Sequence, residues 1–169
     1  NEQDSLTYMS AEKVYMNEGC ESAVESFRKY LDKFTNGNFA VNAHFYMADC
    51  FNRQGRKEEA LKHYQYVIEQ PQNSFTEQAL SAAAHINMDM ELYRKALDQL
   101  KALEKVAEVQ RNLIFSRVGQ MRAHYILENY QNAYEAADKV LHTENINAHD
   151  EREAHFIKAK ALFYEEKYD

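Results

Sequence analysis

Residues that interrupt helices are scarce in this sequence, which has one proline and four glycines among 169 residues. Three glycines and the proline are spaced about one helix length apart, at Gly19, Gly37, Gly55 and Pro71. The remaining glycine, Gly119, falls inside a predicted helix, where we expect it to allow a neighbouring side chain to pack closely. Because 45% of the residues are apolar, enough of them are present to form a core. The composition therefore predicts an all-α fold.

Long apolar runs, clustered positive charge and the common catalytic motifs are missing as well. No stretch approaches the roughly 18 uninterrupted apolar residues that a membrane span needs. We find no glycine-rich phosphate loop, serine nucleophile elbow, His-Glu-x-x-His pair or Cys-x-x-Cys pair. The net charge is −7, whereas nucleic-acid binding draws much of its affinity from clustered Lys and Arg. The sequence thus predicts neither an enzyme nor a membrane span, and neither a cofactor nor a nucleic-acid partner.

Seven histidines raise the question of a metal site. The densest group is His149, Asp150, Glu151 and His155. Its two histidines are six residues apart, which places them on opposite sides of a helix. We therefore expect the histidines to have surface or packing roles and predict no metal site.

A small residue recurs at intervals of 37, 36 and 37 residues, at Ala23, Ala60, Ala96 and Ala133. Self-similarity at such a period is typical of a solenoid built from repeated helix pairs. Each of these alanines is followed after four and after seven residues by residues that share its helical face. These residues are Phe27, Tyr64, Leu100 and Ala137, and then Tyr30, Val67, Leu103 and Val140.

Another slim residue precedes three of these alanines by twelve positions, at Ala11, Ala48 and Ala84. The exception is Met121, which precedes Ala133. Two helices approach closely only where both have little bulk. The pairs therefore predict the points at which the two helices of each repeat cross.

In these positions the chain resembles the tetratricopeptide repeat family, whose small residues at positions 8 and 20, aromatic or aliphatic residue at 24 and apolar residue at 27 match those above. The resemblance covers the whole chain and implies one right-handed α-solenoid of about four and a half helix-turn-helix repeats, at 4–37, 41–74, 77–110, 114–147 and, in part, 152–169. The family's tryptophan at position 4 is absent, and its closing proline survives only near its place as Pro71. The places of the tryptophan are taken by Thr7, His44, Leu80, Arg117 and His155.

The last repeat has a first helix but only the start of a second. A terminal solenoid repeat needs a polar outer face or a partner. We therefore expect the chain to be a piece of a longer protein and to self-associate through this uncapped C-terminal repeat.

The resemblance also implies where a partner binds, namely on the concave face lined by the first helix of each repeat. The residues at its positions 5, 9 and 12 that we single out are Tyr8, Glu12, Tyr15, Phe45, Asp49, Asn52, His85, Arg122, Tyr125 and Lys160. Along position 9 the charge changes from acidic Glu12 and Asp49 to basic Arg122 and Lys160. Such a groove is suited to binding an extended or helical segment of another protein in a single orientation. The alternative is that several of the aromatic rings pack between repeats.

Alanine- and aromatic-rich segments at 26–34, 42–51 and 153–163 are similar to those of bacterial envelope members of the family, namely the periplasmic partner of the Tol-Pal system and the lipoprotein of the outer-membrane barrel-assembly machine. This resemblance implies a scaffold in the periplasm or envelope of a Gram-negative bacterium, with the cytoplasm as the alternative. The predicted function is non-catalytic protein binding in envelope assembly or maintenance. A sensor that binds a small ligand in the same groove is the alternative function.

The two cysteines fall in regions that adjoin in a stacked array. Cys20 begins the second helix of the first repeat, and Cys50 lies late in the first helix of the next. They are either two buried small apolar residues or, in an oxidising compartment, a disulfide. A disulfide requires Cα atoms within about 7 Å.

Overall fold

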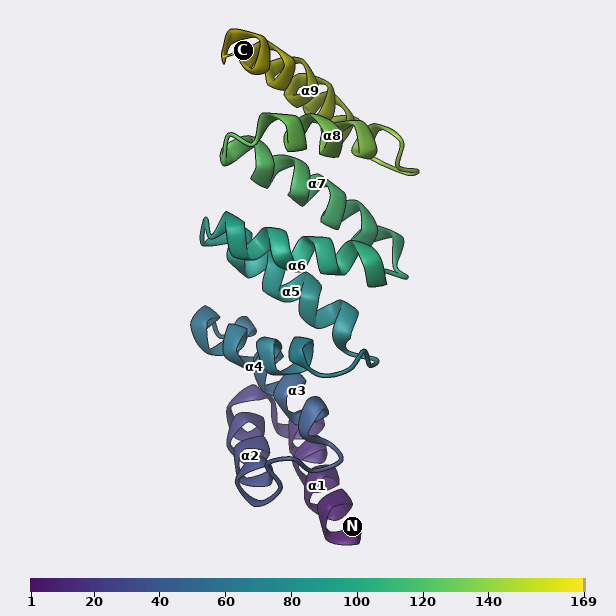
Figure 1. The fold of residues 1–169 in the computed structure, drawn as a ribbon. Helices are drawn as coiled ribbons and strands as arrows, with labels where there is room; N and C mark the ends of the chain where they lie inside the picture. Colours follow the sequence, from purple (N-terminus) through teal and green to yellow (C-terminus); the bar gives the residue numbers. More distant parts are fainter. Residues whose placement is uncertain (169) are drawn as a thin grey trace. The chain divides into compact units, whose positions relative to one another are not determined.

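In a computed structural model, which describes residues 1–168, the chain is entirely helical (Figure 1). The described residues form nine helices and no strand, which confirms the predicted fold class. The helices are α1 (Glu2–Glu18), α2 (Cys20–Lys33), α3 (Ala40–Arg53), α4 (Lys57–Glu69), α5 (Thr76–Asp89), α6 (Tyr93–Val106), α7 (Gln110–Ile126), α8 (Tyr130–Leu141) and α9 (Ala148–Tyr168).

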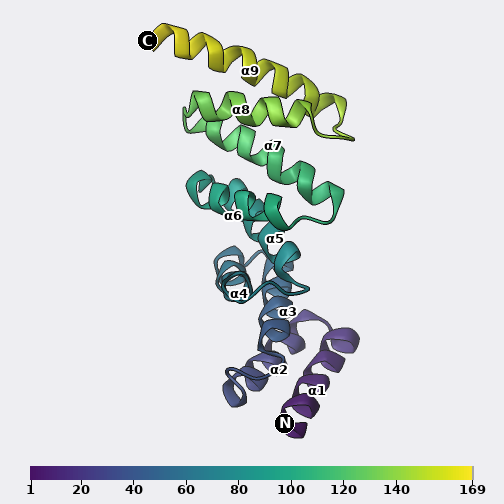
Figure 2. The same cartoon turned by 45° about the vertical axis from the view of Figure 1, so that its right-hand side comes forward.

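The chain divides into two compact units, Asn1–Ala79 and Leu80–Asp169, and each is described by itself. The first contains α1 to α4 and the first turn of α5. Its helices pack in chain order, α1 on α2, α2 on α3 and α3 on α4 (Figure 2). In the second unit α6 packs on α7, α7 on α8 and α8 on α9. Each helix thus contacts mainly its chain neighbours, as the repeat pattern predicts.

The predicted crossing residues are buried throughout both units. The pairs Ala11/Ala23, Ala48/Ala60, Ala84/Ala96 and Met121/Ala133 are at most 3% exposed. Met121 fits because Ala137, in the same core cluster, stands where the other repeats have Phe27, Tyr64 or Leu100. A large residue on one helix thus compensates a small one on its neighbour. This burial is what the repeat register predicted from the alanines requires.

Gly119 marks another close approach, between α7 and α6. A Cβ atom at this position would lie 2.9 Å from both Leu100 Cδ1 and Leu100 Cδ2. Leu100 is fully buried, so its side chain has little room to move. The packing role that the sequence predicts for Gly119 is confirmed.

The turns within successive helix pairs share one backbone feature. Gly55, Glu91 and Glu128 have φ angles of 76°, 59° and 61° and are spaced 36 and 37 residues apart. Each is in the left-handed region, which glycine adopts more easily than other residues. Two of these three residues are glutamates. A glycine therefore marks this turn in the sequence only between α3 and α4.

A buried polar network fixes the connection between α2 and α3. Tyr30 donates its hydroxyl hydrogen to Asp4 Oδ1 at 2.5 Å, and the Asn38 backbone N–H donates to Asp4 Oδ2 at 2.9 Å. The Tyr30 hydroxyl accepts a hydrogen bond from the Phe39 N–H at 3.1 Å. The bonds from Tyr30 and Asn38 lower the pKa of Asp4. They hold the start of α3, the helix that carries Phe45 and the residues after it.

The crossing at Ala60 gives a direct test of the register. Ala60→Leu should overpack the contact between α3 and α4 and lower the free energy of unfolding by about 1–3 kcal/mol. Lys62→Leu, at an exposed position of the same helix, is the control and should change it by less than about 0.5 kcal/mol. Urea unfolding followed by circular dichroism measures both. Equal stability of the two variants would show that Ala60 is not a crossing residue.

Candidate functional site

The predicted groove residues fall in both units. Tyr8, Glu12, Tyr15, Phe45, Asp49 and Asn52 come from α1 and α3 of the first unit, and His85, Arg122, Tyr125 and Lys160 come from α5, α7 and α9 of the second.

Tyr8 lies in the core of the first unit and is only 3% exposed. Its ring stacks on Phe39, with 4.4 Å between centroids and 5° between planes, and its hydroxyl donates to Glu12 Oε1 at 3.1 Å. Burial raises its pKa, so the phenol stays protonated. A buried ring offers no surface to a partner, so we leave Tyr8 out of the groove. Its packing between repeats is the alternative that the sequence left open.

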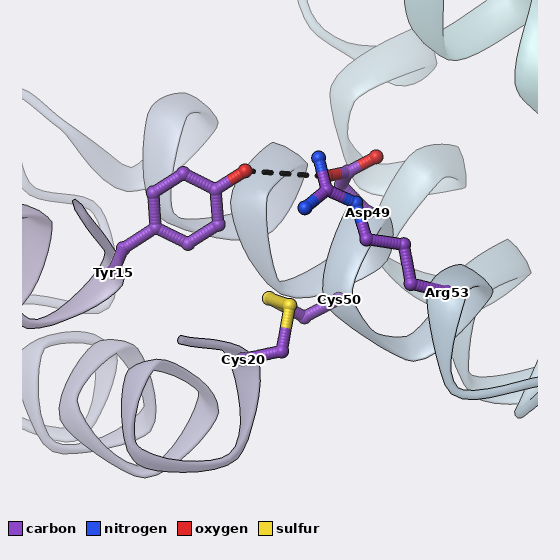
Figure 3. The surroundings of a disulfide bond; sticks show 5 residues. All are labelled: Tyr15, Cys20, Asp49, Cys50 and Arg53. Carbon is purple, nitrogen blue, oxygen red and sulfur yellow. Dashed lines mark hydrogen bonds and ion pairs between the residues drawn. A yellow bond between two sulfur atoms is a disulfide. The ribbon is translucent and has the colours of Figure 1, made fainter. Parts of the chain in front are cut away.

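The other two aromatic residues among the predicted groove residues of this unit, Tyr15 and Phe45, are half-buried. The Phe45 ring lies 4.6 Å from that of Phe75 and 6.1 Å from that of Tyr64. Tyr15 donates its hydroxyl hydrogen to Asp49 Oδ2 at 3.2 Å (Figure 3). Both rings therefore expose only part of their surface, and contacts within the chain hold them in place.

The polar groups of this face also have partners within the chain. Asp49 forms an ion pair with Arg53 at 2.9 Å, and both side chains are drawn in Figure 3. Asn52 Oδ1 accepts a hydrogen bond from Lys57 Nζ at 2.5 Å. Arg53 thus balances the charge of Asp49. The acidic end of the predicted charge gradient is reduced to Glu12.

A disulfide joins Cys20 at the start of α2 to Cys50 in α3 (Figure 3). The two Cα atoms lie 5.1 Å apart, within the reach that such a bond requires. The bond fixes the residue next to Asp49 and ties the first two helix pairs together. Of the two alternatives that the sequence left open, the structure has the disulfide.

The second unit has a cavity of about 470 Å³ on its first-helix face. Three predicted residues, His85, Arg122 and Tyr125, line it. The full lining is His85, Met88, Asp89, Tyr93, Phe115, Gly119, Arg122, Tyr125, Ile126, Glu153 and Ile157. Lys160 lies outside this lining and is exposed, with Nζ 5.8 Å from the Phe156 ring centroid.

Apolar and aromatic groups form much of this cavity. The rings of His85 and Phe115 stack with 3.5 Å between their centroids. Ile126 is 50% exposed although it is a large aliphatic residue. Reading positions 5, 9 and 12 did not identify Phe115 or Ile126. Their helical positions 2 and 13 belong to the same concave face and were the signal available for them.

Arg122 is not the free cation that the sequence predicts. Its guanidinium holds both carboxylate oxygens of Glu153, at 2.8 and 2.7 Å, and Asp150 Oδ1 at 3.2 Å. These bonds, Glu153 first, raise the pKa of Arg122. Among the described residues, the exposed carboxylate of Asp89 in the same lining has no ion pair. The charge left over in this cavity is therefore negative.

The candidate metal group differs from the one that the sequence suggests. His149, Asp150 and Glu153 have ligand atoms within 4.8 Å of one another, and neither Glu151 nor His155 belongs to the group. However, Asp150 and Glu153 already bind Arg122. A guanidinium between the two carboxylates repels a metal ion, so we propose no metal site there.

Large apolar side chains are exposed along α9. Phe156, Leu162 and Phe163 are 53%, 44% and 56% exposed. Self-association through this repeat stays a prediction. Sedimentation velocity should show a larger species at higher protein concentration, and Leu162→Glu should reduce it because the glutamate places a charge in the contact. A monomer at all concentrations would contradict the prediction.

Among residues 1–168, we find no helix with the length and apolar character that crossing a bilayer requires.

The sequence model of the tetratricopeptide repeat matches residues 42–73, which comprise most of α3, all of α4 and part of the loop after it. None of the curated proteins compared with the chain is a significant match.

Solved structures match over nearly the whole chain. A tetratricopeptide repeat protein from Parabacteroides merdae aligns with a TM-score of 0.68 at 20% identity, over 97% of this chain and 62% of its own. The chain thus spans less than two thirds of that protein. MamA from Desulfovibrio magneticus aligns with a TM-score of 0.63 at 16% identity, over 100% of this chain and 98% of its own. At these identities the likeness establishes the fold.

Proposed function

Because the chain has the fold of tetratricopeptide repeat proteins, we propose that it is a non-catalytic scaffold that binds an extended or helical segment of another protein on its first-helix face. The observation that carries the proposal is the cavity of the second unit, where Ile126, Phe115 and Tyr125 offer apolar surface to solvent. Partly exposed apolar side chains on a concave surface are typical of binding sites.

The chemistry of the cavity indicates what the segment carries. Apolar lining favours an apolar side chain as the anchor. The unpaired Asp89 favours a Lys or Arg beside that anchor, because Glu153 already neutralises Arg122. The proposed partner segment thus combines one buried apolar residue with one basic residue.

Site-specific photo-crosslinking tests this proposal. A photoreactive amino acid at Ile126 should capture a partner in extracts, whereas one at Val109, an apolar residue 47% exposed outside the cavity lining, should not. With the captured partner, Ile126→Asp should weaken binding about tenfold or more, and Val109→Asp should leave it unchanged. Both sites are exposed, so both variants should fold. Binding unaffected by Ile126→Asp would place the partner elsewhere.

The cell envelope or periplasm is the proposed location, and the Cys20–Cys50 disulfide supports it. Disulfides persist in oxidising compartments and are rare in the cytosol. If the native protein, alkylated at the moment of cell lysis, carried two free thiols, the cytoplasmic alternative would be correct.

A small-ligand sensor is the second candidate, and the size of the cavity favours it. At about 470 Å³, the cavity falls within the range of about 300–1,000 Å³ found for small-molecule sites. A metabolite that raises the melting temperature of the parent but not of Ile126→Asp would support the sensor. A captured protein segment supports the scaffold.

A further inference from the structure

The second unit has another cavity, of about 220 Å³, between α6, α7 and α8. We call it the α6–α8 cavity. It shares no lining residue with the cavity of about 470 Å³. Most of its lining side chains carry N–H groups that can donate hydrogen bonds, namely Lys101, Arg117, Gln120, His124, Asn132 and Lys139. A lining rich in donors favours a ligand with acceptor atoms.

Three of these donors already hold a carboxylate of the chain itself. Glu104 accepts hydrogen bonds from Arg117 Nε at 2.8 Å and from Gln120 Nε2 at 3.1 Å, and Lys139 Nζ lies 3.3 Å from its Oε2. Burial alone would raise the pKa of Glu104, but the bonds from Arg117 and Gln120 help to outweigh it and lower the pKa. The donors of α7 and α8 are thus placed so that they stabilise an ionised carboxylate.

Two other lining residues, Lys101 and His124, have no such partner. Among the described residues, Lys101 forms no ion pair. His124 is only 6% exposed, and its Nδ1 is buried without a hydrogen-bond partner. It lies seven residues after Arg117 on α7, which is two helical turns or about 10 Å from the position of the bound Glu104. Since an unpaired buried polar group is unfavourable, packing alone does not explain this histidine.

His124 can donate one hydrogen bond into the cavity. Burial and then Lys101 lower its pKa, while Glu135 opposes this effect, so the ring is neutral at pH 7 and carries one N–H. A buried N–H without a partner is rarer in proteins than a buried acceptor without one. We therefore assign the hydrogen to Nε2, the nitrogen that is not buried in this way. The Nε2–H group then faces the cavity that the ring lines.

We propose that the α6–α8 cavity binds a small molecule through a carboxylate group, held between the Lys101 ammonium and the His124 Nε2–H. The ligand is smaller than a drug-sized molecule, because sites for such molecules measure about 300–1,000 Å³. The site lies apart from the proposed segment-binding face, so it does not depend on the scaffold function.

The charge of the cavity favours a carboxylate over a phosphate. The charged side chains on its lining, together with the bound Glu104, have a net charge of +1, since three are cationic and two are anionic: Lys101, Arg117, Lys139, Glu104 and Glu135. One monoanion balances this charge. A phosphate group with a charge near −2 exceeds it and is repelled by Glu135.

An NMR titration of the full chain with sodium acetate, which replaces sodium chloride at constant ionic strength, tests the site. The imidazole signals of His124 should shift and reach saturation, and sodium phosphate should bind no more tightly than acetate. Lys101→Gln should weaken acetate binding about tenfold, because it removes a charge-assisted hydrogen bond. Lys105→Gln, at an exposed position of α6 outside the lining, is the matched control and should bind acetate like the parent.

His124→Leu separates binding from a structural role. Leucine fills a similar volume without an unpaired buried atom, so the melting temperature should not fall, whereas the acetate-induced shifts of backbone amide signals in α6 and α8 should vanish. The proposal fails if the His124 signals of the parent do not saturate. Equal binding by Lys101→Gln and Lys105→Gln would show an adventitious ion only. A lower melting temperature with unchanged acetate binding in His124→Leu would make the ring a packing residue.

Discussion

Acidification from pH 7 to pH 4.5 should lower the free energy of unfolding of the parent protein by about 2–3 kcal/mol more than it lowers that of His44→Asn. The pKa of His44 is lowered from 6.5 to about 4 by burial, and each pKa unit corresponds to about 1.4 kcal/mol. Between pH 6.5 and about 4 the unfolded chain holds a proton that the folded chain does not. The stability from neutral His44 is therefore complete above pH 6.5 and is lost as the pH falls toward 4.

Urea unfolding at several pH values measures this difference. Comparing the slope of stability against pH removes any constant cost of the substitution itself. His155→Asn, at an exposed position of α9, is the control for replacing a histidine by asparagine. If the parent and His44→Asn lost the same stability on acidification, His44 would not be held neutral by the fold.

Arg122→Glu should lower the free energy of unfolding by about 2–3 kcal/mol. It removes the cation that Asp150 and Glu153 bind and adds a third carboxylate beside them. The cost of breaking a fully buried pair is about 3–5 kcal/mol, and we reduce it because Arg122 is 38% exposed. From the sequence alone we would expect a different result, mainly a change in the salt dependence of partner binding.

Arg53→Glu is the matched control for this variant. Its pair with Asp49 also joins an arginine to a carboxylate, but the Arg53 side chain is 64% exposed, so we expect a loss below about 1 kcal/mol. Thermal and urea unfolding of both variants provide the comparison. Equal losses would mean that the contacts of Arg122 with α9 add no more stability than a surface ion pair.

The fold was predictable because the same helix–helix contacts recur in every repeat and are made by similar residues at equivalent positions. A residue at a helix crossing must be small in every repeat, so the spacing of Ala23, Ala60, Ala96 and Ala133 identifies the register. The exception at Met121 depends on Ala137, a compensation that appears only when both positions of the pair are considered together. The turns at Glu91 and Glu128 gave no such signal, because their left-handed backbone occurs without glycine.

The site was less predictable because its chemistry depends on partners in other helices. Reading one position across repeats shows Arg122 as a cation but not Glu153, which lies 31 residues later. Similarly, Tyr8 lies on the expected helix, but its ring points into the core. A small rotation of a helix about its axis decides whether such a residue faces the groove or the core. Pairings such as His44 with His63 depend on how two helices pack, which periodicity does not specify.

The bond between Cys20 and Cys50 also affects how the chain comes apart. In a repeat array whose members contact mainly their neighbours, unfolding begins in the least stable repeat and then propagates to the adjacent repeats. A cross-link over 30 residues removes roughly 3–4 kcal/mol of chain entropy from the unfolded state. The oxidised first unit should therefore be the last part to open, and a protease acting on the native protein should cut the second unit first. Reduction should remove this order and let fraying begin at either terminus.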